Sequence, residues 1–184
     1  MKKEPLQLSR WIASIAVFLN IGLNYYTNAN PLNGKTIGEV SDQYPTLFTP
    51  AGYAFSIWGI IYLGLIIYSI VQLLPSQRKY RVYDRLAMPL LATSLLSIAW
   101  VVSFSYEAVT ISEAIIVAML ITSLVLFVRS KGDTDETSSV KWIRVPFSLY
   151  AGWLSVATIA STATWLYSLN GGVVHLGKRP GRLL

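Results

Sequence analysis

Aromatic side chains are the residues of this sequence best suited to binding. The chain has 6 Trp, 11 Tyr and 6 Phe, against one His and no Cys. Trp58 and Trp100 lie well inside apolar stretches, and Tyr53, Phe55 and Tyr62 fall within three turns around Trp58. Aromatic faces inside a helical bundle can bind a flat apolar ligand through stacking and burial of area. The alternative is ordinary packing of a hydrophobic core.

Groups for acid–base or metal chemistry are scarce. His175 is the only histidine, and no ionisable residue lies in the middle of an apolar stretch. Coupled transporters usually place Asp, Glu, Arg or His there. Glu107 and Glu113 lie near the ends of two stretches, either as a carboxylate pair or as solvated helix-end residues. The sequence therefore predicts no catalytic residue, no required cofactor and no metal site.

The composition is that of a membrane protein. Hydrophobic residues make up 53% of the 184 residues and charged residues 13%, with a mean hydropathy of +0.49. An average soluble domain is about 25% charged. Disorder is excluded by the high hydrophobicity. The apolar runs are continuous, whereas strands of a membrane β-barrel alternate apolar and polar residues.

Four long segments carry no Asp, Glu, Lys or Arg, and a helix crosses the hydrocarbon layer in about 20 residues. These segments are 11–34, 43–77, 86–106 and 145–177. Including the apolar run after Glu107, the sequence predicts an all-α bundle of five transmembrane helices, at about 11–27, 50–74, 86–105, 110–128 and 145–169. Residues 28–49 form an extracytoplasmic lid loop, and residues 171–184 are an atypical tail whose Gly-rich, basic composition indicates truncation.

The basic residues predict the orientation. The N-terminus and the loops near residues 78 and 131 together hold eleven Lys and Arg, whereas the two other loops hold only Lys35. Basic residues collect in cytoplasmic loops. We therefore expect a multi-pass protein of the cell (inner) membrane with a cytoplasmic N-terminus. The same rule explains the net charge of +6 without nucleic acid. The basic tail would lie outside after five crossings, against the rule.

Polar and small residues at helical spacing predict contacts between helices. Asn20 and Asn24 lie on one face of the first helix, where buried amides bond across helices or touch a ligand. Gly52 and Ser56 are four residues apart, which permits close backbone approach inside the bundle or in a homodimer.

The segment from Phe48 to Tyr62 resembles the tryptophan-rich sensory protein (TspO/MBR) family, which includes the mitochondrial translocator protein. Pro50, Gly52, Phe55, Trp58 and Tyr62 match the pattern with which helix 2 of that family opens; Ala51 and Tyr53 depart from it. Trp100 and Phe104 match part of the helix 3 element. Trp153-Leu-Ser155-Val-Ala157-Thr158 resembles the helix 5 element, and Ser161 stands where the family usually has Asn.

The resemblance covers about residues 8–170 and implies a five-helix bundle, often dimeric, with a ligand cavity under the lid. Family ligands are tetrapyrroles such as protoporphyrin IX and haem. The ligand-binding residues that we predict are Tyr53, Phe55, Trp58, Tyr62, Trp100, Phe104, Trp153 and Ser161. Lys35 is the basic group expected near the mouth for the carboxylates of a porphyrin. No His or Cys is placed to bind iron.

These residues favour a membrane sensor or binding protein for a flat apolar ligand of the tetrapyrrole class, linked to its transport or to stress signalling. Its partners would be the bilayer, the ligand and a second copy of the chain. Two alternatives stay open. One is an enzyme that degrades porphyrin in light, with Trp58 or Trp100 as electron donor. The other is a small permease without tetrapyrrole specificity.

Overall fold

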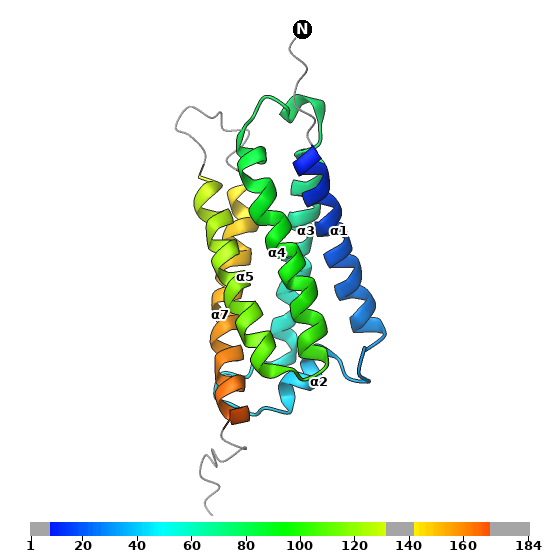
Figure 1. Ribbon diagram of the computed structural model, residues 1–184, viewed down its shortest axis with the longest axis vertical. Helices are drawn as coiled ribbons and strands as arrows, with labels where there is room; N and C mark the ends of the chain where they lie inside the picture. Colours follow the sequence, from blue (N-terminus) through cyan, green and yellow to red (C-terminus); the bar gives the residue numbers. More distant parts are fainter. Residues whose placement is uncertain (1–7, 132–141, 170–184) are drawn as a thin grey trace, which may run out of the picture.

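A computed structural model describes residues 8–131 and 142–169, and these residues contain helices and no strands (Figure 1). The long helices are α1 (Leu8–Ala29), α3 (Ile57–Val71), α4 (Val82–Ser105), α5 (Val109–Arg129) and α7 (Arg144–Leu169). The shorter elements are α2 (Ile37–Asp42) and the 3-10 helices η1 (Gly52–Ser56) and η2 (Pro75–Gln77). The tail 171–184 lies outside the described residues.

The long helices form a closed bundle. Helix α4 packs on both α1 and α5, α5 packs on α7, and α3 completes the ring between α7 and α1. Helix α2 lies at the end of the bundle where α1 and α7 finish (Figure 1). We call this the lid end. The core between the helices is apolar, as one continuous cluster that includes Leu65, Leu90 and Phe147.

Three helices are long and apolar enough to cross a membrane within the described part of the chain: Gly52–Val71, Val82–Ser105 and Val109–Arg129. Helices α1 and α7 are of similar length, with 22 and 26 residues. Large apolar side chains such as Ile15, Ile60, Leu95 and Ile121 are exposed on the outside of the bundle. A membrane protein is the class that this surface fits, because hydrocarbon takes the place of water there.

The second predicted helix begins later than the sequence suggested. We expected it from Pro50, but Ala51 is extended, with φ −62° and ψ 144°. The 3-10 helix η1 follows, and the α-helix starts only at Ile57. The loop 28–49 also contains a helix that the sequence analysis did not predict. Thr36 caps α2, accepting a bond from the Glu39 N–H, while the Glu39 carboxylate accepts from the Thr36 N–H.

Pro89 lies two turns inside α4 rather than in its first turn, because α4 begins at Val82 and not near Leu86. A proline in a helix has no N–H for the carbonyl oxygen four residues earlier, which here is that of Arg85. The Arg129 Nη1 donates to this oxygen at 3.4 Å. A side chain from α5 thus bonds to the group that the proline leaves without a helical donor.

Arg10 is buried, although the sequence placed it in a polar N-terminal segment. Its Nε donates to Asp84 at 2.6 Å, and its other nitrogens donate to the carbonyl oxygens of Gln72, Gln77 and Tyr80 at 3.0–3.3 Å. One guanidinium therefore joins the start of α1 to the α3–α4 connection, at the end of the bundle away from the lid.

Among the glycines of the long helices, Gly64 of α3 lies closest to a neighbouring helix. A Cβ added there would lie 2.8 Å from the Pro146 Cβ of α7, whereas one added at Gly59 or Gly52 would meet nothing within 4 Å. Among the described residues nothing packs against Gly52 of the predicted pair Gly52 and Ser56, and the alternative that this pair lies in a homodimer contact stays a prediction. Gly64 sets how near α3 comes to α7.

We expect Gly64→Ala to lower the free energy of unfolding by about 1–3 kcal/mol, because the proline ring opposite cannot move aside without moving α7. Gly59→Ala on the same helix is the control and should be neutral or slightly stabilising. Unfolding in detergent with added denaturant measures both. Equal stability of the two variants would contradict a tight α3–α7 contact.

Arg10→Met should cost about 2–3 kcal/mol of stability. The three carbonyl oxygens lose a charged donor, and a buried acceptor left unpaired costs about 1–3 kcal/mol. Arg81→Met, at a neighbouring exposed position, serves as the control. Thermal unfolding of the two variants in the same detergent gives the comparison; a loss no larger than that of the control would show Arg10 to be dispensable.

Candidate ligand-binding site

Two adjoining cavities lie at the lid end of the bundle. The first, which we call the aromatic chamber, holds about 40 Å³ and is lined by Ile37, Ser41, Pro50, Phe55, Trp58, Trp100, Phe104, Ile116, Met119, Trp153, Leu154, Ala157, Ala160, Ser161 and Thr164. The second, the α1–α3 cleft, holds about 540 Å³ and is lined by Ile21, Asn24, Tyr25, Thr27, Asn28, Thr36, Ile37, Gly38, Gly52, Phe55, Ser56, Trp58, Gly59, Tyr62 and Trp100. The two share Ile37, Phe55, Trp58 and Trp100.

The structure brings seven of the eight residues predicted for the site to these cavities. Phe104, Trp153 and Ser161 line the chamber, Tyr62 lines the cleft, and the shared residues include the other three. Tyr53 is the exception, since it is 83% exposed and lines neither cavity. Tyr53 lies in the 3-10 helix η1, which has no buried residues.

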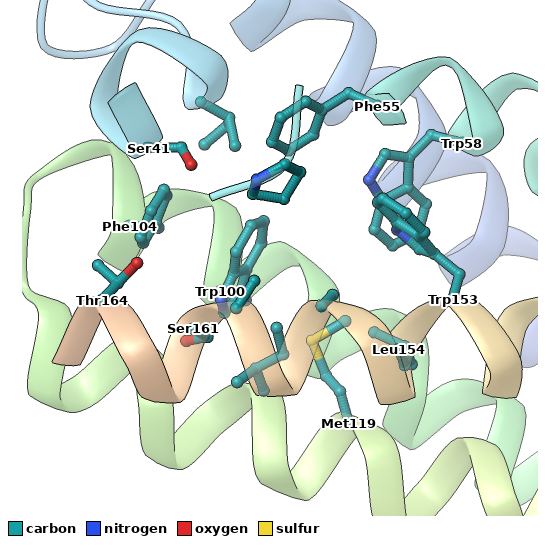
Figure 2. A pocket seen from close by; sticks show the side chains of 15 residues that line it. Ser41, Phe55, Trp58, Trp100, Phe104, Met119, Trp153, Leu154, Ser161 and Thr164 are labelled. Atoms are coloured by element: carbon teal, nitrogen blue, oxygen red, sulfur yellow. The ribbon is translucent and has the colours of Figure 1, made fainter. Parts of the chain in front are cut away.

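The aromatic rings form two walls. Trp58 lies 6.2 Å from Trp153 and stacks on Tyr62 at 5.3 Å between ring centroids. Trp100 stacks on Phe104 at 5.1 Å with an angle of 10° between the ring planes. Figure 2 shows Trp58 and Trp153 together on one side, Phe104 on the other, and Trp100 between them. The arrangement offers ring faces and edges from α3, α4 and α7 to one ligand.

Several polar atoms in these walls are buried and have no hydrogen-bond partner within residues 8–131 and 142–169. They are the indole N–H groups of Trp100 and Trp153, the Ser161 Oγ and the Tyr62 hydroxyl. An indole N–H can only donate. Leaving such a group unpaired costs about 1–3 kcal/mol. The walls can therefore accept a mainly apolar ligand that carries a few hydrogen-bond acceptors.

The lining residues of both cavities are uncharged. Over residues 8–131 and 142–169, the structure contains no group of three or more His, Cys, Asp or Glu side chains that could hold a metal ion. Glu107 and Glu113, which the sequence left as either a carboxylate pair or solvated helix-end residues, make separate contacts. Glu113 accepts a bond from Thr162 at 2.7 Å, and Glu107 accepts one from Lys35 at 2.8 Å.

Asn20 and Asn24 bond to each other along α1. The Asn24 Nδ2 donates to both the backbone and side-chain oxygens of Asn20 at 2.9 Å. Asn20 is buried, and Asn24 lines the α1–α3 cleft. The structure gives Asn24 a place in a cavity wall, and the hydrogen bonds of its side chain stay within α1.

The lid closes the cavities from the connection between α1 and α3. Ile37 and Ser41 of α2 reach the aromatic chamber, and Thr36 and Gly38 reach the cleft. The Tyr44 ring, just after α2, contacts the edge of Tyr167 on α7 at 6.3 Å. Partial burial raises the pKa of Tyr44.

An ion pair joins the lid to the turn between α4 and α5. The Lys35 Nζ donates to Glu107 at 2.8 Å and to Gln43 at 3.1 Å. The Lys35 hydrogen bond lowers the pKa of Glu107 below its ordinary value of 4.5. Glu107 occupies the tight turn between α4 and α5 with φ 57°, a left-handed conformation that is unfavourable for a residue with a Cβ. The sequence predicts that Lys35 binds the carboxylates of a porphyrin, but in the structure Lys35 is paired with the Glu107 carboxylate.

Sequence reasoning missed the residues that α2 and α5 supply. Ser41 of α2 and Met119 of α5 line the chamber, together with Thr164 of α7. Their types carry no signal in the sequence, because Ser, Thr and Met are common on buried helix faces. Only the packing of the lid and of α5 on α7 places them at the cavity.

A family model described as TSPO-like protein matches residues 10–178. The chain belongs to the TSPO-like family. No curated protein and no solved structure gives a significant match. The resemblance to the TspO/MBR family that the helix 2, 3 and 5 motifs indicated is thereby confirmed, and the departures at Ala51 and Tyr53 fit a divergent member. The family match covers every helix that forms the two cavities.

The lid of this TSPO-like chain should loosen in acid. Because the pKa of Glu107 is lowered, the ion pair is fully present above pH 4.5 and is lost as the pH falls through the lowered value. The chain has no Cys, so spin labels on Asp42→Cys and Ile111→Cys can report the distance from α2 to α5. We expect the distribution of distances between the two labels to broaden below pH 4.5.

Glu107→Gln should show the broadened distance already at neutral pH. Glu39→Gln is the control, since the pKa of Glu39 is also lowered, by its hydrogen bond to the Thr36 backbone, and Glu39 does not contact Lys35. The acid transition should persist in the Glu39 variant. If the acid transition disappears in Glu39→Gln and persists in Glu107→Gln, the capping of α2 and not the ion pair determines the position of the lid.

Proposed function

We propose that this chain is an integral membrane binding protein for a flat apolar ligand of the tetrapyrrole class, with the lid controlling entry. The observation that carries the proposal is the pair of aromatic walls, Trp58 with Trp153 and Trp100 with Phe104, under α2. Aromatic faces and buried apolar area are what a porphyrin ring needs. Membership in the TSPO-like family supports the same class of ligand.

The two cavities differ in what they can hold. A volume of about 40 Å³ accommodates no large ring, whereas about 540 Å³ lies in the usual range of ligand pockets, roughly 300–1,000 Å³. The ring would therefore lie mainly in the α1–α3 cleft, against Trp58 and Trp100, which line both cavities, with one edge reaching toward Trp153 and Phe104 in the chamber. No His or Cys lines either cavity, so metal-free protoporphyrin IX should bind at least as well as haem.

In the membrane, all the long helices would cross the bilayer, which makes five crossings with α1 and α7 included. The membrane would be the inner membrane of the cell. The N-terminus and the α3–α4 connection would face the cytoplasm, because the α3–α4 connection and the start of α4 hold the basic residues Arg78, Lys79, Arg81 and Arg85. The lid would face outward. Binding would serve transport of the ligand or signalling of stress, with a second copy of the chain as a partner.

Replacing both Trp58 and Trp153 with Leu should weaken binding of protoporphyrin IX about thirtyfold, because each lost ring contact costs about 1 kcal/mol. Porphyrin fluorescence in a titration of the detergent-solubilised protein measures the Kd without relying on Trp emission. Trp11→Leu removes an exposed Trp from the outer face of α1 and is the matched control. Unchanged affinity in a folded double variant would refute the proposed binding wall.

A further inference from the structure

The ion pair of Lys35 and Glu107 lies next to residues that line the two cavities, and we call the position of this ion pair the rim. Lys35 directly precedes Thr36 and Ile37, which line them from the lid, and Glu107 follows Phe104, which lines the chamber from α4, by three residues. The Lys35 side chain is 43% exposed and that of Glu107 31%. Both charged groups can therefore exchange partners with a solute that enters between lid and bundle.

The cavities behind the rim hold no charge of their own, since all their lining residues are uncharged. An ionised carboxylate that enters such walls loses its hydration and gains no counter-ion, which is costly. An ester or another neutral acceptor loses far less and can still accept from the Trp100 or Trp153 N–H. The interior thus favours uncharged ligands, and any acidic group has to stay at the rim.

At the rim, Glu107 already neutralises the cation that an acidic ligand needs. The Lys35 Nζ donates to Glu107 at 2.8 Å, and Gln43 takes a second of its bonds at 3.1 Å. A ligand carboxylate approaching Lys35 would be repelled by Glu107. The backbone holds Glu107 in place, because its own N–H donates to the Phe104 oxygen and its carbonyl oxygen accepts from Val109.

We propose that Glu107 is a built-in competitor for ligand carboxylates, so that the site prefers uncharged ligands and an acidic ligand must displace Glu107 from Lys35. The left-handed backbone at Glu107, φ 57°, fits this role, because it keeps a strained residue where its carboxylate meets the lid. Displacement would also release the lid from the α4–α5 turn. This inference rests on the proposed binding of a flat apolar ligand, and it states which charge state of that ligand the site prefers.

The experiment compares protoporphyrin IX with its dimethyl ester, which has the same ring and no carboxylate. The measured quantity is the ratio of the two Kd values at pH 7 in full-length protein in one detergent. Unmodified protein should bind the ester more tightly. Glu107→Gln frees Lys35. It should therefore strengthen binding of the acid relative to the ester about fivefold, as expected for a partly exposed ion pair. Lys35→Met should weaken binding of the acid relative to the ester.

The double variant Lys35→Met with Glu107→Gln should lose the gain of Glu107→Gln, because the freed cation is then missing. Glu39→Gln is the matched control, as it removes another lid carboxylate that contacts Thr36 and not Lys35. Opening of the lid alone would change both affinities equally and leave the ratio constant.

If the ratio of the two Kd values is the same in all these variants, Glu107 does not compete with ligand carboxylates, although porphyrin binding itself still stands. Tighter binding of the acid than of the ester by the unmodified protein overturns the preference for uncharged ligands. If folded, unmodified protein binds neither compound, the proposed function itself fails, and the charge selectivity fails with it. The three results are distinguishable in one set of titrations.

Discussion

The contact of Gly64 with Pro146 is the constraint on which the ligand cavities depend. It brings α3 against α7 where a side chain larger than hydrogen would strike the proline ring. About two turns along each helix, Trp58 and Trp153 meet at 6.2 Å. The short distance between the helix axes at the proline therefore sets the position of one aromatic wall. The other wall, Trp100 with Phe104, is held separately by α4 between α1 and α5.

The two ends of the bundle are held by charged contacts of different kinds. At one end, buried Arg10 bonds to three backbone oxygens and to Asp84, which makes that end rigid. At the lid end, Lys35 and Glu107 are partly exposed and meet across two loops. An exposed ion pair contributes little stability, about 0–1 kcal/mol. The lid end, where the cavities lie, is therefore held by the weaker of the two contacts.

A binding site without charge in its walls suits a membrane protein. Burying ionised groups in an apolar bundle is expensive, and here the only titratable side chain lining a cavity is tyrosine. Affinity has to come from ring contacts and from neutral donors such as the Trp153 N–H. Charge lies outside the cavity linings, where Lys35 and Glu107 are partly exposed.

The sequence by itself predicted the helical class, the apolar surface, the family and most of the aromatic side chains that line the cavities. These follow from regularities within single helices, such as the length of apolar runs and the spacing of Phe55, Trp58 and Tyr62. Tertiary structure decided what depends on partners far apart in the chain: the exposure of Tyr53, the burial of Arg10, and the choice of Gly64 over Gly52 as the close contact. It also paired Lys35 with Glu107 across 72 residues. No local pattern encodes such a pair, because packing alone brings the two loops together.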